Sequence, residues 1–483
     1  MTVFDVIYAG MTSAYNDGKI GRVSGTSAAS ASVGADFSVL DSSSTDPRLV
    51  SFPNKAGALR VLLCNRGGAP GSPGTGTNWV LNPSSLTAAE YGGSFSPPAG
   101  IAGLTVANVY GAVQSPVNSD YLYIIDYDTA SIYCLNLVAR PTPPPAQPIY
   151  TLTRGINPVY AFNKYSSDDY TLAGVDIIAV GGYVYALFTA SQDAYSGPYL
   201  NSYVCKFQPQ ANGTLLKVDE ANWPTVGGNA LSLNYAKFTR QGAASESEYL
   251  FIPAIGGMQK AGSGNGAASV VDVVDITGGT TLAKKPFSAL YGTYPTSGTQ
   301  DFHGLAVSQD GSTLLVLTCV YATNYSGTNW RLSRGTAEQL VNYSESSTTH
   351  SVEDLTPSAY EDNSPGYFWA VALAEGTSDS GGTAILARGF TGDTNFDSGV
   401  GLSLNPAASY FTTPKNFSSS DLYGASNVDG VINTMALCSS VGAPSILRSA
   451  IPHPVVAGHF ASTADYIGHL RRKIAEENAA RTK

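Results

Sequence analysis

Short apolar runs of strand type recur along the chain at a nearly constant interval. The strongest of these runs end at seven positions: Ala9, Cys64, Asp126, Phe188, Ala254, Cys319 and Arg388. Successive ends are 55, 62, 62, 66, 65 and 69 residues apart. Self-similarity at a fixed period is typical of a fold that repeats one supersecondary unit. The pattern therefore predicts a repeat protein rather than two or three unrelated domains.

Each interval repeats the same order of short strands. A first strand precedes the strong run by about 14 residues, as in the stretch FHGLAVSQDGSTLLVLT at residues 302–318. The letters QDG there predict a tight turn between two antiparallel strands. A third strand and a weaker fourth strand fit in the remainder of each interval. Four short antiparallel strands per unit, repeated seven times, describe a β-propeller.

The tetrapeptide GTNW occurs twice, at Gly76–Trp79 and at Gly327–Trp330. Each copy follows an apolar run that carries a cysteine near its end, Cys64 before the first copy and Cys319 before the second. The copies are 251 residues apart, which equals four of the intervals above. The tetrapeptide is therefore interpreted as the same point in two structural units.

The two ends of the chain predict how the ring closes. Residues 429–440, DGVINTMALCSS, have the pattern of a first strand, but no strong second strand follows them. The chain begins with a second-strand pattern, VFDVIYAG, at residues 3–10. The prediction is an all-β, seven-bladed β-propeller over residues 1–460. Pairing of the C-terminal innermost strand with the N-terminal strands would leave no open edge; six or eight blades also fit the spacing.

Residues 461–483 are an exception to the strand pattern. A capping Ser or Thr precedes apolar residues on one helical stripe: Tyr466, Ile467, Leu470 and Ile474. The sequence predicts a short C-terminal amphipathic α-helix. This helix packs on its own propeller, docks a partner or assembly, or frays.

Composition narrows the function classes. Charged residues make up 13% of the chain, about half the usual share, while Tyr alone contributes 29 residues. The net charge of −10 argues against nucleic-acid binding. No apolar run approaches the ~20 residues of a membrane span, and no signal peptide is visible at the N-terminus. The five cysteines lie in apolar runs, which favours small buried side chains over disulfides or metal ligands.

The period, the phrase HGLAVSQDG and the predicted closure resemble the seven-bladed lactonase-like propeller family, which includes 6-phosphogluconolactonase-type proteins. In the enzymes of that family, Arg, His and Glu residues at the channel mouth carry the chemistry. The resemblance implies a hydrolase or isomerase site with His303, Arg48 and Asp176 as catalytic candidates. Other first strands open with Tyr110, Tyr235 and Trp369 and depart from the family pattern.

Four long loops predict a binding surface. They are nearly uncharged and rich in Gly, Ser, Asn, Thr and Tyr, a composition that supplies rigid aromatic contacts and adaptable hydrogen bonds. The candidate ligand-binding residues are Trp79, Trp330, Tyr195, Tyr199, Tyr325 and Trp369. The alternative is that both tryptophans pack between blades and the loops are only solvated.

One segment has the spacing of a metal site. Residues 392–399, GDTNFDSG, place Asp393, Asn395 and Asp397 at alternate positions, as the first half of a calcium loop does. Ser398 and Leu404 stand where such a loop has Gly and Glu. The segment is therefore either a partial calcium site or an ordinary Asx-rich turn. No other cofactor is expected.

These observations favour a non-enzymatic propeller that serves as a binding or structural module on a cell surface or a phage-like particle. Its expected partner is a glycan or a protein, and its expected location is extracellular or on the particle surface. The alternatives are the lactonase-like hydrolase or isomerase and an architectural shell subunit. Convergent charged groups across blades would indicate the enzyme, whereas exposed aromatic residues on the loops would indicate the binding module.

Overall fold

The computed structural model is built almost entirely of short strands in the part of the chain that it describes. The described residues are 4–12, 18–25, 30, 32–34, 44–53, 59–67, 79–82, 87–88, 109–126, 130–136, 148–151, 171–191, 202–218, 225–226, 229–255, 270–277, 280–286, 298–322, 328–342, 353–354, 366–374, 383–390, 401–406, 415–417, 430–437 and 449–450. The predicted C-terminal helix, residues 461–483, lies outside them.

The described strands form seven antiparallel sheets, numbered 1 to 7 in chain order. Sheet 1 contains β3 (Ser32–Val33), β2 (Gly18–Gly25), β1 (Phe4–Thr12), β30 (Gly430–Leu437) and β31 (Ser449–Ala450). Sheet 2 contains β4 (Ser44–Pro53), β5 (Leu59–Gly67), β6 (Trp79–Asn82) and β7 (Thr87–Ala88). Sheet 3 contains β8 (Val109–Gln114), β9 (Tyr121–Asp126), β10 (Ser131–Asn136) and β11 (Pro148–Thr151).

The other four sheets follow the same plan. Sheet 4 contains β12 (Thr171–Val180), β13 (Tyr183–Ser191), β14 (Ser202–Pro209), β15 (Leu215–Lys217) and β16 (Thr225–Val226). Sheet 5 contains β17 (Asn229–Ala230), β18 (Asn234–Phe238), β19 (Ser247–Ile255), β20 (Val270–Asp275) and β21 (Thr280–Pro286). Sheet 6 contains β22 (Gly298–Val307), β23 (Leu314–Ala322), β24 (Thr328–Gly335) and β25 (Glu353–Asp354). Sheet 7 contains β26 (Gly366–Ala374), β27 (Thr383–Phe390), β28 (Gly401–Pro406) and β29 (Lys415–Phe417).

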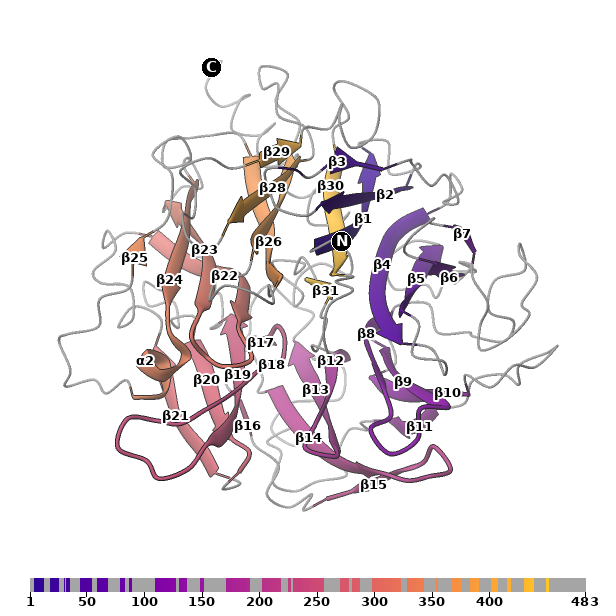
Figure 1. The fold of residues 1–483 in the computed structure, drawn as a ribbon, viewed down its shortest axis with the longest axis vertical. Coiled ribbons are helices and arrows are strands. Elements are labelled where there is room, and N and C mark those ends of the chain that lie inside the picture. Colours follow the sequence, from indigo (N-terminus) through magenta and orange to yellow (C-terminus); the bar gives the residue numbers. More distant parts are fainter. Residues whose placement is uncertain are drawn as a thin grey trace.

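The sheets follow one another around the molecule in chain order (Figure 1). First strands of successive sheets contact each other. Examples are the pairs β4 and β8, β8 and β12, and β22 and β26. In sheet 1, β1 from the N-terminus pairs with β30 from the far end of the chain, with Val6 opposite Leu437 and Thr12 opposite Gly430. The predicted all-β, propeller-like fold is confirmed.

Both faces of a sheet are buried because neighbouring sheets pack on both. In β13, Val184 and Phe188 belong to the core between sheets 3 and 4. Tyr185 and Leu187, the intervening residues, belong to the core between sheets 4 and 5. Alternate side chains of a strand point to opposite faces, so a strand between two cores must be apolar at nearly every position. This explains why the strong runs read as continuous rather than alternating.

The tryptophans of the two GTNW copies lie in corresponding strands of the fold. Trp79 begins β6 and Trp330 lies in β24, which are the third strands of sheets 2 and 6. The pairing differs by one position along the second strand, since Trp79 is opposite Leu63 and Trp330 is opposite Cys319.

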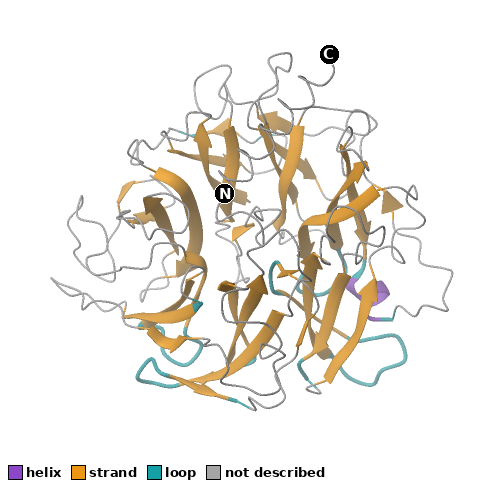
Figure 2. Ribbon diagram, turned by 180° about the vertical axis from the view of Figure 1, so that it is seen from behind, coloured by secondary structure: helices purple, strands orange, loops and turns teal. Residues whose placement is uncertain are grey.

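A short helix, α2 (Ala337–Val341), follows β24 and was not predicted from the sequence (Figure 2, purple). Its capping box consists of Thr336, whose hydroxyl accepts from the Gln339 N–H, and Gln339, whose side chain accepts from the Thr336 N–H. The Arg240 guanidinium, from the turn before β19, donates to Asn342 Oδ1 with Nε at 3.1 Å and Nη2 at 2.8 Å. The helix therefore joins sheet 6 to the hairpin of sheet 5.

Candidate functional site

The catalytic candidates Asp176, His303 and Arg48 lie on first strands: β12 of sheet 4, β22 of sheet 6 and β4 of sheet 2. Trp369 lies on β26, the first strand of sheet 7. Of these four residues, the structure describes the side chain of Asp176. The remaining loop and metal candidates lie outside the described residues: Tyr195, Tyr199, Tyr325, Asp393, Asn395 and Asp397.

Five first strands carry a β-bulge opposite the end of the apolar run in the second strand. The extra residue at the bulge is, in chain order, Tyr110, Val175, His303, Trp369 and Asn433. Bulges re-aim side chains and are common beside functional sites. His303 and Trp369, which the sequence singled out, thus hold equivalent backbone positions in two strands that contact each other, β22 and β26.

Asp176 follows the bulge of β12 and is buried, with 7% of its surface exposed. Its Oδ1 accepts a hydrogen bond from the N–H of Ile177 at 2.8 Å, and its Oδ2 accepts one from the N–H of Leu233 at 2.7 Å. Leu233 belongs to the short break between β17 and β18 in sheet 5. On the other side, a Cβ at Gly111 of sheet 3 would lie 3.1 Å from Asp176 Oδ1. The carboxylate therefore links sheet 4 to sheet 5 by a hydrogen bond and lies close to the backbone of sheet 3.

A second buried link joins sheets 4 and 5 at the same break. The Ser202 hydroxyl donates to Thr189 Oγ1 at 2.9 Å and accepts from the N–H of Ala230 at 2.9 Å. Asp176 and Ser202 thus accept hydrogen bonds from the N–H groups of Leu233 and Ala230. These two residues flank residues 231–232, where the first strand of sheet 5 is interrupted. Buried amides need such acceptors, because an unpaired N–H in the interior is costly.

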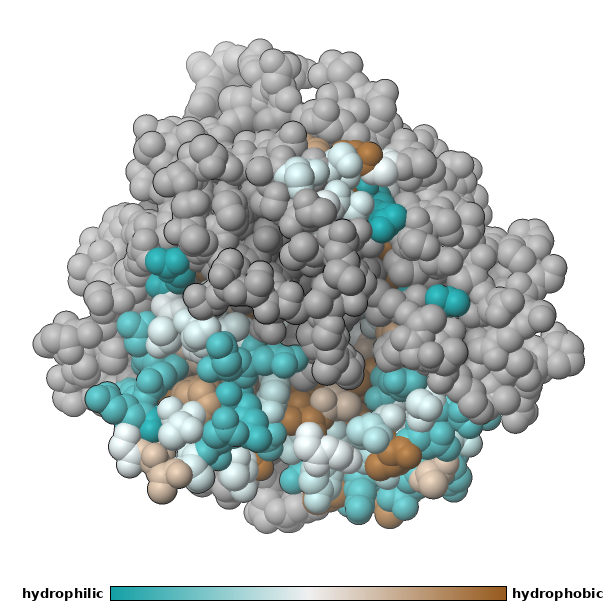
Figure 3. Space-filling view, viewed as in Figure 1, coloured by the Kyte–Doolittle hydropathy of each residue, from teal (hydrophilic) through white to brown (hydrophobic). Residues whose placement is uncertain are grey.

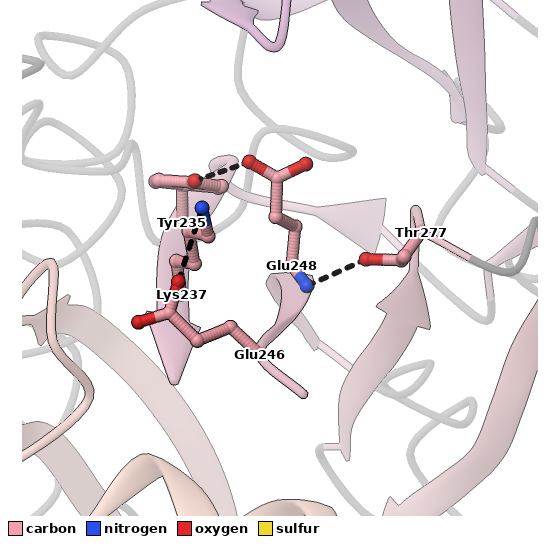
Figure 4. Close-up of polar contacts among 5 residues, drawn as sticks. All are labelled: Tyr235, Lys237, Glu246, Glu248 and Thr277. Carbon is pink, nitrogen blue, oxygen red and sulfur yellow. Dashed lines mark hydrogen bonds and ion pairs between the residues drawn. The ribbon is translucent and has the colours of Figure 1, made fainter. Parts of the chain in front are cut away.

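The boundary of sheets 4 and 5 also carries a group of aromatic and charged residues, called here the tyrosine cluster: Tyr183, Tyr185, Lys206, Tyr235 and Glu248. The Lys206 ammonium lies 4.1 Å from the centre of the Tyr183 ring and 5.8 Å from that of Tyr185. The Tyr235 hydroxyl donates to Glu248 Oε1 at 2.7 Å (Figure 4). Cation–π and charge-assisted bonds of this kind hold side chains in fixed positions.

Two further contacts lie beside the tyrosine cluster (Figure 4). The backbone N–H of Glu248 donates to Thr277 Oγ1 at 2.8 Å, which ties β19 to the turn after β20. Next to it, Lys237 and Glu246 form an ion pair at 3.2 Å, with 47% and 58% of their side chains exposed. An exposed pair of this type contributes little stability.

Burial and a neighbouring carboxylate keep the phenols of Tyr185 and Tyr235 protonated. Burial raises the pKa of Tyr185, and the negative charge of Glu248 raises it further. Burial also raises the pKa of Tyr235, together with its hydrogen bond to Glu248. Both phenols are therefore neutral hydrogen-bonding and aromatic groups at physiological pH rather than acids or bases.

The sequence held only a partial signal for the tyrosine cluster. Tyr183 and Tyr185 alternate along β13, as do Tyr235 and Lys237 along β18, so each pair shares a face of its strand. The interaction between Tyr185 and Glu248 crosses from sheet 4 to sheet 5, and no spacing along the chain indicates it.

A separate polar group closes the turn between β22 and β23, in the QDG motif. Asp310 Oδ1 accepts from the Ser308 hydroxyl at 2.6 Å and from the N–H and hydroxyl of Ser312 at 2.9 and 2.8 Å. Burial alone would raise the pKa of Asp310, but these hydrogen bonds outweigh it and the pKa lies below its ordinary value. The O of Gly311 accepts from the N–H of Ala337, so the turn also supports α2.

The described cysteines behave as the sequence predicted. Cys205 is buried and Cys134 is half-buried, and both are free thiols. Burial raises the pKa of Cys134 to about 12, which keeps the thiol protonated and unreactive.

The described residues contain neither a metal-binding cluster nor a membrane-crossing helix. They contain no group of three or more His, Cys, Asp or Glu side chains with the arrangement of a metal site. Likewise, no helix in the described ranges has the length and hydropathy needed to cross a membrane.

The described surface is mostly polar. Figure 3 shows hydrophilic residues with separate hydrophobic ones between them. Val117 and Leu216 are the described large hydrophobic residues with about half of their surface exposed, 51% and 53%. Scattered apolar residues of this kind are normal on a protein surface.

No protein-family model matches the sequence, and no curated protein matches it. The fold is similar to that of a periplasmic gluconolactonase from Pseudomonas aeruginosa, with a TM-score of 0.47, 14% identity, and coverage of 93% of this chain and 99% of the other. It is also similar to a polysaccharide lyase described as an ulvan lyase, with a TM-score of 0.45, 11% identity, and coverage of 81% and 88%. A luciferin-regenerating enzyme gives a TM-score of 0.38, 11% identity, and coverage of 77% and 94%. These similarities concern the fold and assign no activity to this chain.

Proposed function

We propose that the seven sheets are the blades of one seven-bladed propeller and that the pairing of β1 with β30 closes it. The contacts between successive first strands support this arrangement, as does the position of β1 between β2 and β30 in sheet 1. Closure of this kind joins the two ends of the chain in one blade and removes the free sheet edges that would invite aggregation.

We further propose that the propeller is a non-enzymatic binding module that recognises a glycan or protein partner outside the cell or on a particle surface. The observation that carries this proposal is the tyrosine cluster. It combines aromatic rings, neutral phenols and an ordered ammonium, which suit recognition of polar ligands rather than proton transfer. The bonding of Asp176 also favours it, because both carboxylate oxygens bind backbone amides.

The test is a binding screen of the full-length protein against an array of neutral and acidic glycans. Tyr183→Ala and Lys206→Ala should each weaken binding about tenfold, because each removes one side of the cation–π pair. Lys237→Ala is the matched control, since it removes an equivalent charge from an exposed ion pair nearby. Equal binding by all three variants would contradict the role of the tyrosine cluster.

A lactonase-like hydrolase is the second candidate function. The observation in its favour is that His303 and Trp369 occupy equivalent bulges on contacting strands, β22 and β26. Such an enzyme would hydrolyse small lactones, and His303→Ala would abolish turnover while leaving the thermal midpoint unchanged. Full activity of His303→Ala, or no turnover of any lactone tested, would exclude this function.

A further inference from the structure

The hairpin between β14 and β15 has a rigid, anchored tip. The N–H of Gln210 donates to the O of Thr214 at 2.9 Å, and the N–H of Gly213 donates to the O of Gln210 at 3.0 Å. Gly213 has a φ of 87° and packs so closely on sheet 3 that a Cβ would lie 2.7 Å from Tyr121 Cδ1. Only glycine fits such a position without strain.

A bond from the preceding sheet also holds the tip. Asn118, in the turn between β8 and β9, donates from Nδ2 to the O of Ala211 at 2.8 Å. The backbone of residues 210–214 is therefore fixed on sheet 3, while the side chains of Asn212 and Thr214 are exposed.

Asn212, Gly213 and Thr214 form an Asn-x-Thr triplet, the acceptor pattern for N-linked glycans. Asn212 Oδ1 accepts two hydrogen bonds from Thr214, one from the hydroxyl at 2.8 Å and one from the N–H at 3.1 Å. The amide nitrogen Nδ2 makes no hydrogen bond within the described residues. The triplet thus presents its nucleophilic nitrogen to solvent while the threonine holds the oxygen.

A second Asn-x-Ser triplet begins at Asn342, and the side-chain amide of this asparagine is occupied. Asn342 Oδ1 accepts from Arg240, and its Nδ2 donates to Glu338 Oε1 at 3.3 Å. A glycan on this nitrogen would crowd its bond to Glu338, whose carboxylate also accepts from the N–H of Gln241 in the sheet 5 hairpin. The two triplets are alike in sequence. They differ in the side-chain nitrogen, which donates a hydrogen bond in Asn342 and makes none within the described residues in Asn212.

We propose that Asn212 is an acceptor site for an N-linked glycan, donated by a lipid-linked oligosaccharide diphosphate. Asn212 Nδ2 forms a bond to the anomeric carbon of the sugar as the bond from that carbon to the diphosphate oxygen breaks. The lipid diphosphate leaves with the bonding electrons, and the proton lost from Nδ2 passes to a base of the transferase. This inference goes beyond the binding function and rests on the extracellular location proposed above.

The experiment expresses the full-length chain behind an added cleavable secretion signal in insect cells, so that its outcome does not depend on glycan binding. Peptide mapping of the secreted protein should find a glycan on Asn212. Asn212→Gln and Thr214→Ala should each remove the mass of one glycan, and Asn212→Gln should leave the thermal midpoint within about 1 °C of the unglycosylated protein. Asn342→Gln is the matched control, which should lower the midpoint without removing glycan from residue 212.

A second measurement does not require secretion or folding. The chain, behind the same added signal, is translated with endoplasmic-reticulum microsomes after the other three Asn-x-Ser/Thr triplets are removed by Asn324→Gln, Asn342→Gln and Asn416→Gln. A gel shift that a glycosidase reverses is the expected result. An unmodified Asn212 in the secreted protein, or no shift with microsomes that glycosylate a control protein, overturns the proposal.

Discussion

Replacing Asp176 by alanine tests whether this carboxylate links sheets or performs chemistry. In the wild type it accepts hydrogen bonds from the N–H groups of Ile177 and Leu233 at 2.8 and 2.7 Å, and Leu233 is fully buried. Asp176→Ala removes both acceptors. Because a buried donor left unpaired costs about 1–3 kcal/mol, the free energy of unfolding should fall by about 2–6 kcal/mol. The free energy of unfolding of Asp176→Asn should lie between those of the wild type and Asp176→Ala, since asparagine keeps one acceptor oxygen and places an NH₂ against the other donor.

The assay combines thermal unfolding with hydrogen exchange. The midpoint of Asp176→Ala should drop by roughly 2–6 °C for a protein of this size. Exchange should accelerate in the peptide that covers residues 229–238, because the amide of Leu233 loses its acceptor. Glu246→Ala is the control: it also removes one carboxylate, but from an exposed ion pair, and should change stability by less than about 1 kcal/mol.

Two outcomes would refute this reasoning. If Asp176→Ala and Glu246→Ala unfold at the same temperature and residues 229–238 exchange as in the wild type, the carboxylate does not support the break in sheet 5. If the midpoint is unchanged while turnover of a lactone is lost, Asp176 is catalytic and the binding-module proposal fails.

Three other predictions concern single residues. The hydroxyl of fully buried Tyr249 has no hydrogen-bond partner among the described residues. Tyr249→Phe should therefore raise the free energy of unfolding by about 1 kcal/mol in urea titrations, and a clear loss of stability would contradict this. The pKa of Asp310 is lowered on folding, so its contribution to stability is present above its ordinary pKa of 3.8 and is lost as the pH falls through the folded value. The stability difference between wild type and Asp310→Asn should therefore be constant near neutral pH and shrink in acid; a difference independent of pH would contradict this. A Cβ at Gly174 would lie 2.5 Å from Ile125 Cγ1 and 2.6 Å from the O of Asp126, so Gly174→Ala should lower stability by about 1–3 kcal/mol, measured by urea unfolding, and an unchanged midpoint would show that sheets 3 and 4 can separate slightly.

Strand order and turn chemistry were predictable because they depend on neighbours in the chain. The continuous apolar run from Leu314 to Val316 indicates a strand buried on both faces, and the QDG letters before it indicate a turn. The helix α2 was missed because its five residues are too few to show a helical period. The sequence indicates this helix only through Thr336 and Gln339, which have the spacing of a capping box. That spacing is informative only where a helix follows.

The candidate site residues were predictable as residue types but not as neighbours. Asp176 was selected as a charged residue near the start of a first strand. Its partner Leu233 lies 57 residues further along, in the next sheet. The tyrosine cluster likewise brings Tyr185 of one sheet close to Glu248 of the next. Such contacts depend on how two sheets stack, and spacing within one strand does not contain that information.

By itself, the sequence determined that this chain forms a series of similar four-stranded units, because side-chain alternation and turn preference are local properties repeated at a fixed period. Only the tertiary structure decided which polar groups serve as links between units. A buried carboxylate or hydroxyl takes its role from the donor that faces it, and for Asp176 and Ser202 that donor is an amide of the next sheet.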